Sequence, residues 1–349
     1  MHHRLRSVLL TLFFLNHLSA NSQDSVRVTE EMSQLATVKI TQNTDLENLT
    51  VRDGQRLIRL SPNIRPVTRV NFSYRYLSFG FSFASRFLEE PNNRINKGRS
   101  RLKGFGGGFN FQHWQQSFNY SRTQGFYLEN TGDYDPAWEP GQPYLQFPQL
   151  VYKQFLGATA YSFNKDFSVK AITTHSERQL KSAGSFIPLF TYNYYISDDR
   201  SVPSPGNATQ KAKSLELLLG PGYYYTWVMN KKFYASLGLT ALGGMVFTKI
   251  QNRAGRQITE GFQRNGAWRL DGNLGIGYNS RRFFAGMYVR ALATRFRQQH
   301  TPVVNTNGRA MGFLSVGYRF NAPAPVKKAV AYTDRKILQL RNSILPLKH

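Results

Sequence analysis

The sequence feature that most restricts the fold is a strand-length alternation between aromatic and small or polar side chains, clearest in residues 77–87. Successive side chains of a β-strand point to opposite faces. One face of this segment therefore carries mainly rings and the other small or polar groups: Leu77, Phe79, Phe81, Phe83 and Phe87 against Ser78, Gly80, Ser82, Ala84 and Arg86. A soluble sandwich also alternates, but its buried face would be mixed aliphatic. A ring-covered face instead predicts a wall that meets lipid outside and water inside.

The pattern continues from about residue 56 to residue 320, between connections of two kinds. Tight connections fall near Tyr76-Leu77, His113-Trp114, Asn164-Lys165, Asn230-Lys231-Lys232 and Ser280-Arg281. Long polar connections fall at 89–100, 126–149, 197–213, 248–264 and 297–307. Short turns alternating with long loops are typical of outer-membrane barrels. With a first strand near 56–61, and 166–196 counted as one crossing, we predict an all-β fold: a single antiparallel transmembrane β-barrel of about twelve strands, with ten as the alternative.

Composition agrees with a wall that meets lipid with only every second residue. Aromatic residues make up 14% of the chain, yet its mean hydropathy of −0.44 is that of a soluble protein. The longest apolar run, Val8 to Leu15, is too short to span a bilayer as a helix. The chain has no cysteine, so disulfides cannot stabilise an exported fold, whereas closure of a barrel can.

The two ends of the sequence predict export. Arg4 and Arg6 precede the apolar run, and Ala20-Asn21-Ser22 supplies small residues for cleavage, so residues 1–22 are predicted to be a signal peptide. Residues 23–55 are predicted to be an acidic periplasmic lead, and residues 56–320 the barrel. Residues 321–349 are predicted to be a proline-containing linker and a short basic periplasmic tail. The expected location is the cell outer membrane.

The segment 166–196 is long enough for two strands, and its run 175–185 is polar on both faces. One interpretation is that this run folds inward and narrows the lumen. The candidate constriction residues are then His175, Glu177, Arg178, Lys181, Ser182 and Ser185. The alternatives are an overlong external hairpin or a bulged strand, and these are the simpler interpretations.

The formal net charge of +25 would suggest nucleic acid in another context. Export and the spread of charges among strand-like alternations argue against that partner. Outer-membrane lipids and lipopolysaccharide are the expected counterparts, and one cluster could bind lipopolysaccharide phosphates: Arg94, Lys97, Arg99, Arg101 and Lys103. A solvated loop of ordinary positive charge explains the cluster equally well. The loop 126–149, rich in rings and prolines, is the expected external recognition surface.

The sequence offers little catalytic chemistry. No histidine pair has metal-ligand spacing and thiols are absent, so we expect no metal and no cofactor. A lipid hydrolase would need a serine close to a histidine, and His175 with Ser176, Ser182 or Ser185 is the candidate set. Nearness in sequence does not establish such a pair. We therefore expect a non-enzymatic protein, with an outer-membrane lipid-modifying hydrolase as the alternative.

Three stretches give the chain a resemblance to a known family: Leu60-Ser61-Pro62-Asn63, Tyr74-Arg75-Tyr76-Leu77-Ser78-Phe79-Gly80 and the run Gln179 to Ser185. Together with the signal peptide, they resemble an uncharacterised Bacteroidota outer-membrane β-barrel family, domain of unknown function 4421. The resemblance implies a barrel and carries no activity or site. The expected role is a narrow pore, a small-molecule or lipid transport channel, or a structural membrane protein. The barrel-assembly machinery is an expected partner during biogenesis, because the pattern ends on an aromatic residue, Phe320.

Overall fold

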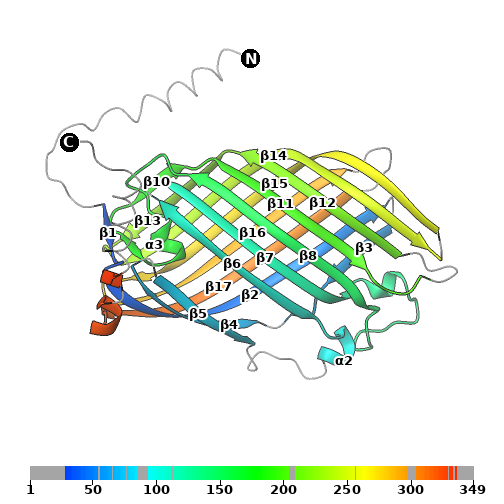
Figure 1. The fold of residues 1–349 in the computed structure, drawn as a ribbon, viewed down its shortest axis with the longest axis horizontal. Coiled ribbons are helices and arrows are strands. Elements are labelled where there is room, and N and C mark those ends of the chain that lie inside the picture. Colours follow the sequence, from blue (N-terminus) through cyan, green and yellow to red (C-terminus); the bar gives the residue numbers. More distant parts are fainter. Residues whose placement is uncertain are drawn as a thin grey trace, which may run out of the picture.

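The computed structural model describes residues 28–335 apart from 54–55, 65, 76, 85–92, 112, 204–208, 256, 298–303, 329 and 333–334. The predicted signal peptide, residues 1–22, lies outside the described residues. Within the described part, fifteen strands form one curled antiparallel sheet, and two short strands form a second sheet inside it (Figure 1). None of the described helices is long and apolar enough to cross a membrane.

The wall consists of twelve crossings, because three pairs of strands each continue one another. The crossings are β2 (Leu35–Asp53), β3 (Arg56–Ser61) with β4 (Val67–Tyr74), β5 (Leu77–Ala84), β6 (Arg101–Phe111), β7 (Trp114–Leu128), β8 (Gln146–Tyr161), β10 (Ala183–Phe186) with β11 (Leu189–Asp199), β12 (Thr209–Gly220) with β13 (Gly222–Met229), β14 (Phe233–Ala254), β15 (Gln257–Asn279), β16 (Phe283–Arg297) and β17 (Val304–Asn321). Proline separates each pair, at Pro62, Pro188 and Pro221, since it cannot donate to a ladder. The predicted transmembrane barrel of twelve strands is confirmed.

The first strand of the wall is not where we predicted it. β2 pairs with β17 from Leu35↔Asn321 to Arg52↔Val304, so the first and last strands close the barrel. Most of the predicted periplasmic lead, residues 23–55, is therefore part of the wall. The reason is that the outward positions of β2 carry Val38 and Ile40 where other strands carry rings, so the aromatic alternation is missing there.

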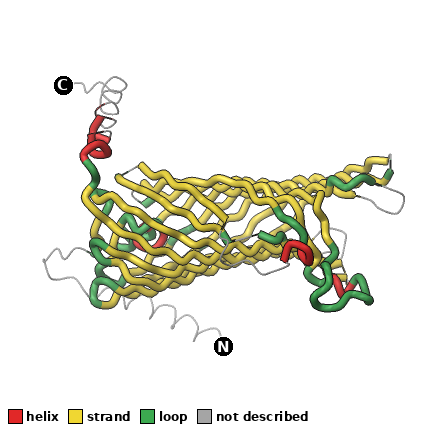
Figure 2. Tube along the Cα trace, turned by 90° about the horizontal axis from the view of Figure 1, so that it is seen from below, coloured by secondary structure: helices red, strands yellow, loops and turns green. Residues whose placement is uncertain are grey.

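The connections divide between the two ends of the barrel. At one end, which we call the turn end, lie the short connections after β4, β6, β13 and β15 and the segment between β8 and β10. The opposite end, the loop end, carries the helices α2 (Asn93–Lys97) and η1 (Thr131–Asp133). The predicted loop 248–264 is wrong: β14 and β15 continue through it as a paired hairpin that projects from the barrel (Figure 2).

Side chains alternate across the wall as predicted. Along β14, Leu237 and Leu239 are 53% and 55% exposed on the outside, whereas Ser236 and Thr240 are buried inside. Rings cluster next to the turns, for example Trp114 against Tyr161 with centroids 5.0 Å apart. On β15, Tyr278 and Trp268 bound a run of exposed aliphatic residues whose length matches the roughly 9–11 residues a tilted strand needs to cross a membrane.

The C-terminal segment folds back on the turn end. Residues 324–328 and 330–332 are helical, so the helix begins within the predicted proline-containing linker and continues into the predicted basic tail. Val330 is 1% exposed and packs with Ala36, Tyr74 and Ala322. The helix therefore covers the turn-end margin of the wall beside β2 and β4.

Candidate functional site

Two segments far apart in the sequence fill the turn end of the barrel. Residues 28–34 contain β1 (Thr29–Glu31), and residues 162–182 contain α3 (Lys170–Thr173) and β9 (Glu177–Gln179). The strands pair through Thr29↔Gln179 and Glu31↔Glu177, and the amide of Met32 donates to the carbonyl of Ser176 at 2.8 Å. We call these two segments together the plug. Figure 1 shows β1 and α3 within the turn end.

Short-range polar contacts give the plug its internal shape. The Ser168 hydroxyl accepts the Ala171 amide at 3.0 Å and donates to Glu177 at 2.6 Å. Lys170 pairs with the other oxygen of Glu177 at 3.1 Å. His175 has a positive φ of 59°, which reverses the chain between α3 and β9. The polar run is therefore a folded insert and not a loose hairpin.

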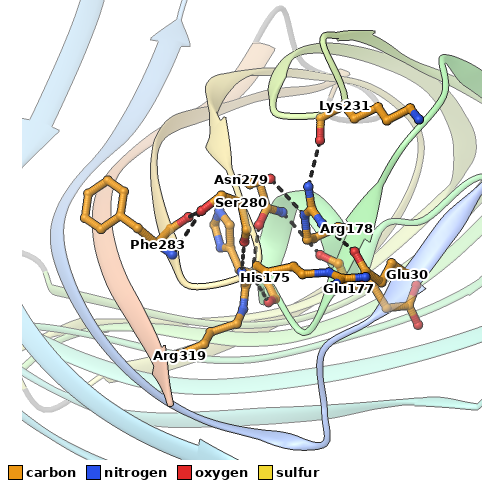
Figure 3. A network of polar contacts seen from close by, with 10 residues as sticks. Glu30, His175, Glu177, Arg178, Lys231, Asn279, Ser280, Phe283 and Arg319 are labelled. Carbon is orange, nitrogen blue, oxygen red and sulfur yellow. Dashed lines mark hydrogen bonds and ion pairs between the residues drawn. The ribbon is translucent and has the colours of Figure 1, made fainter.

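Arginines bind the plug to one side of the wall (Figure 3). Arg178 donates to the carbonyls of Asn279 and Lys231 at 3.0 and 2.9 Å and pairs with Glu30. Arg319, fully buried on β17, donates to the carbonyl of His175 and to the Asn279 side chain. These contacts satisfy turn carbonyls that would otherwise be buried without partners.

His175 lies between the plug and the wall. Its ring stacks on Phe284 of β16 with centroids 4.4 Å apart, and its Nε2 lies 3.4 Å from the Tyr234 hydroxyl. Burial lowers the pKa of His175 to about 3, helped by the charges of Lys39 and Arg319. The imidazole is therefore neutral at physiological pH and is packed as a flat apolar surface.

The serines of the hydrolase hypothesis bond elsewhere. Ser176 shares a hydrogen bond with Thr174, and Ser182 accepts the Val228 amide. Ser185 lies in wall strand β10, 3.0 Å from the Ser162 hydroxyl. The fold thus does not bring these hydroxyls to the imidazole, and in the described residues no group of three His, Asp or Glu side chains forms a metal site.

The candidate constriction residues divide into two sets. Glu177 and Arg178 lie with His175 inside the turn end, while Lys181 and Ser182 lie exposed where the plug rejoins the wall. Ser185 belongs to β10 and does not narrow the lumen by leaving the wall. The crossing that we expected over 166–196 occupies 183–199 instead, and residues 166–182 leave the wall at the turn end.

A polar chamber separates the plug from the opposite side of the wall. Its volume is about 610 Å³, and it is lined by the plug, by Thr37 and Lys39 of β2, by Asn71 and Ser73 of β4, and by Gly108 of β6. A second cavity, of about 240 Å³, lies on the other side of Lys170 and Glu177, against His113 and Gln115. The plug is therefore fastened to β15 and β17. It is also bonded on the chamber side, where the Lys39 ammonium of β2 donates to the carbonyl of Thr173 at 3.3 Å. The amide of Arg75, directly after β4, donates to the carbonyl of Ser33 at 3.0 Å.

The middle of the lumen is closed by charged side chains from the wall. Arg269 donates to Asp271 at 2.8 Å and lies 3.4 Å from Glu216, and Arg290 pairs with Asp271 at 3.0 Å. Arg309 of β17 reaches Gln154 of β8 at 3.1 Å across the lumen. The cavity left between them is about 40 Å³, enough for one or two water molecules. We call these six residues the charged constriction.

Our sequence analysis did not predict the charged constriction. The available signal was charge at inward positions of otherwise apolar strands, such as Glu216 between Leu215 and Leu217. The sequence alone does not show that β12, β15 and β16 bring these charges together.

The predicted lipopolysaccharide cluster lies at the loop end, from α2 into β6. Arg94, Arg99, Arg101 and Lys103 are exposed, and the Lys97 ammonium lies 5.7 Å from the Tyr127 ring. Tyr144 packs against Tyr127 and Trp138 with centroids 5.2 and 4.9 Å apart. Basic and aromatic groups therefore form one surface at this end.

Comparisons with known proteins give one family match and several solved structures with similarity to the chain. The model of domain of unknown function 4421 matches residues 23–320. The chain is similar to the outer membrane protease OmpT from Escherichia coli, at 8% identity and a TM-score of 0.41, over 83% of this chain and 98% of that chain. It is also similar to the translocator domain of the autotransporter NalP from Neisseria meningitidis, at 8% identity and a TM-score of 0.29, over 91% and 96%. No curated protein matches the chain.

Proposed function

Since the chain belongs to the family defined by domain of unknown function 4421, whose name assigns no activity, we propose its function from geometry: a gated transport conduit of the outer membrane. The observation that carries this proposal is the plug, which closes the turn end on one side and leaves a polar chamber of about 610 Å³ on the other. A purely structural barrel has no need of a chamber that holds many water molecules and is lined by charged groups. Short turns face the periplasm in outer-membrane barrels, so the chamber opens toward the periplasm.

Two barriers lie in series along the barrel. The plug depends on Arg178, whose bonds to Asn279 and Lys231 hold it to the turns. The charged constriction depends on the bond between Arg309 and Gln154. A solute that crosses the barrel must pass both, so opening one barrier leaves the other in control of the flow.

The loop-end surface supports a second, compatible role. Four cationic side chains are exposed at the loop end, where phosphates of lipopolysaccharide would be the available anions. They belong to Arg94, Arg99, Arg101 and Lys103. Such contacts would orient the barrel among its lipids and would not require a pathway through it.

Conductance in a planar bilayer tests the proposal. The wild-type protein is expected to give small or rare current steps. Arg178→Gln and Arg309→Ser are each expected to change the current little, and the double variant to raise it strongly, because resistances in series add. Arg200→Gln, which removes a loop-end ion pair with Asp198, is the control and should behave as wild type.

Two results would contradict the conduit. One is a double variant that conducts no better than the wild type although it keeps heat-modifiable migration. The other is lipid hydrolysis by the wild type that disappears in His175→Ala, which would favour the hydrolase.

A further inference from the structure

One seam of the barrel wall lacks a hydrogen-bonded ladder. β5 pairs with β4 from Tyr74↔Leu77 to Val67↔Ala84, and β6 pairs with β7 from Arg101↔Gln124 to Phe111↔Trp114. Among the described residues, no register joins β5 to β6, whereas every other pair of neighbouring crossings is joined. Figure 1 shows the two strands apart on the near side of the barrel. Both strands therefore present an unpaired edge at this seam.

The seam is confined to the part of the wall nearer the turn end. Toward the loop end, β3 pairs directly with β7 through Leu60↔Leu128 and Ser61↔Tyr127. Next to this pair, Asn63 donates to the carbonyl of Gly98 at 2.8 Å and to the Ser100 hydroxyl at 2.7 Å. Ser100 in turn donates to the carbonyl of Gly125 at 2.8 Å. These contacts thus bound the unpaired seam on its loop-end side.

An edge that faces hydrocarbon is energetically costly. Each unsatisfied backbone group in the membrane interior costs several kcal/mol, on the order of the transfer of an amide out of water. A chain that keeps such edges needs a polar partner for them. Water or a polar headgroup at the seam would supply it, and both can reach the seam from the chamber.

The chamber lies directly behind the seam. Ser73 of β4 and Gly108 of β6 line the same volume from the two sides of β5. Gly108 has no side chain to close the inner margin, and a Cβ there would lie 2.5 Å from the carbonyl oxygen of Gln116. The chamber therefore continues to the seam without an intervening side chain on β6.

The two sides of the seam differ in chemistry. Outside, Phe81 and Phe105 are both 65% exposed and flank it with apolar surface. Inside, the chamber is lined by three cations, Lys39, Arg75 and Lys170, against two carboxylates, Glu31 and Glu177. Lys170 pairs with Glu177, and Lys39 donates to the neutral carbonyl of Thr173, so its charge is not neutralised by that bond. An apolar exterior next to a chamber with excess positive charge matches a molecule that has acyl chains and an anionic head.

We propose that the seam between β5 and β6 is a lateral window through which an anionic lipid places its headgroup in the chamber while its acyl chains stay in the bilayer. This inference deepens the proposed conduit by naming its substrate class and its route. The path then leads between periplasm and membrane, through the chamber beside the plug, and does not require the charged constriction to open.

Locking the seam tests the window. Because the chain has no cysteine, Phe81→Cys with Phe105→Cys gives one pair that a bis-maleimide can bridge. A photoreactive p-benzoylphenylalanine at position 73 reports lipid in the chamber through the mass of its adducts in phosphatidylglycerol vesicles. We expect adducts in the unbridged protein and their loss after bridging. Leu237→Cys with Leu274→Cys, opposite each other on β14 and β15, is the matched control, and its bridging should leave the adducts unchanged.

Headgroup charge gives an independent readout. Lys39→Gln is expected to lower the yield of phosphatidylglycerol adducts relative to phosphatidylcholine adducts. Equal adduct yields with the seam bridged and unbridged would overturn the window, as would a bridge that joins two molecules, since the edges would then be covered by a second copy. If the conductance of the Arg178→Gln, Arg309→Ser double variant still rises, the conduit stands and only the lateral route falls.

Discussion

Replacement of Asp271 by alanine is expected to cost about 3–5 kcal/mol of unfolding free energy, the range for breaking a buried ion pair by removing one partner. Asp271 is fully buried in the charged constriction and accepts from both Arg269 and Arg290. Without it, the buried Arg269 guanidinium keeps only Glu216, 3.4 Å away, and the Arg290 side chain, which is 31% exposed, loses its pair with Asp271. Urea unfolding of the lipid-refolded barrel, followed by heat-modifiable migration, measures the loss.

The matched control lies on the same hairpin. Lys249 and Glu260 pair at 2.7 Å near the projecting tip of β14 and β15, where both side chains are about half exposed. Exposed pairs gain little because water and salt screen them. Glu260→Ala should therefore leave the unfolding midpoint unchanged. Equal losses for Glu260→Ala and Asp271→Ala would mean that the constriction is hydrated and does not act as a closed barrier.

Acidification is expected to release the plug. The pKa of His175 is lowered to about 3 in the seated plug, whereas a released imidazole titrates near 6.5. Between these values the released state binds more protons than the seated one, so the seated plug loses stability as pH falls from about 6.5 toward 3. The free energy that favours the seated plug falls by about 1.4 kcal/mol per pH unit in this range. Between pH 7 and pH 4 it falls by about 3 kcal/mol in total.

Amide hydrogen exchange of residues 166–182 measures this release. Exchange in the wild type should accelerate as pH falls, after correction for the intrinsic pH dependence of exchange. His175→Asn removes the titrating group and keeps a residue that tolerates positive φ. Its exchange should be faster than wild type at pH 7, because the stack on Phe284 is lost, but flatter with pH. If amide exchange depends on pH equally in both proteins, the release of the plug is due to its carboxylates, and the role of His175 is contradicted.

The sequence predicts the wall well because a membrane imposes a simple pattern on each strand. Rings outside and small groups inside, as at Leu237 and Ser236, depend on the period of the strand alone. β2 was not predicted as a wall strand, because its outward positions carry Val38 and Ile40 in place of rings. Tight turns, such as the one at Asn230-Lys231-Lys232, are local and were placed correctly.

The candidate site is harder to predict because its contacts join distant segments. Nothing near His175 in the sequence shows that Arg319 will donate to its carbonyl, or that Glu30 will pair with Arg178. The inward run 175–185 was visible as a stretch polar on both faces. Which part of this run turns inward, and which residues it bonds, is decided when distant strands come together in the closed barrel. The alternation along a single strand carries no information about that step.

The contacts of the plug bear on the order in which the barrel and the plug fold. Its segment 162–182 comes from the middle of the chain, yet this segment is held by Glu30 of the segment 28–34, ahead of the first strand of the wall, and by Arg319 on the last strand. These two holding points come together only once β2 and β17 have joined, so the insert can seat only in a finished cylinder. Seating of this segment is therefore expected to follow the joining of β2 and β17, and it ties together the two ends of the polypeptide across that junction.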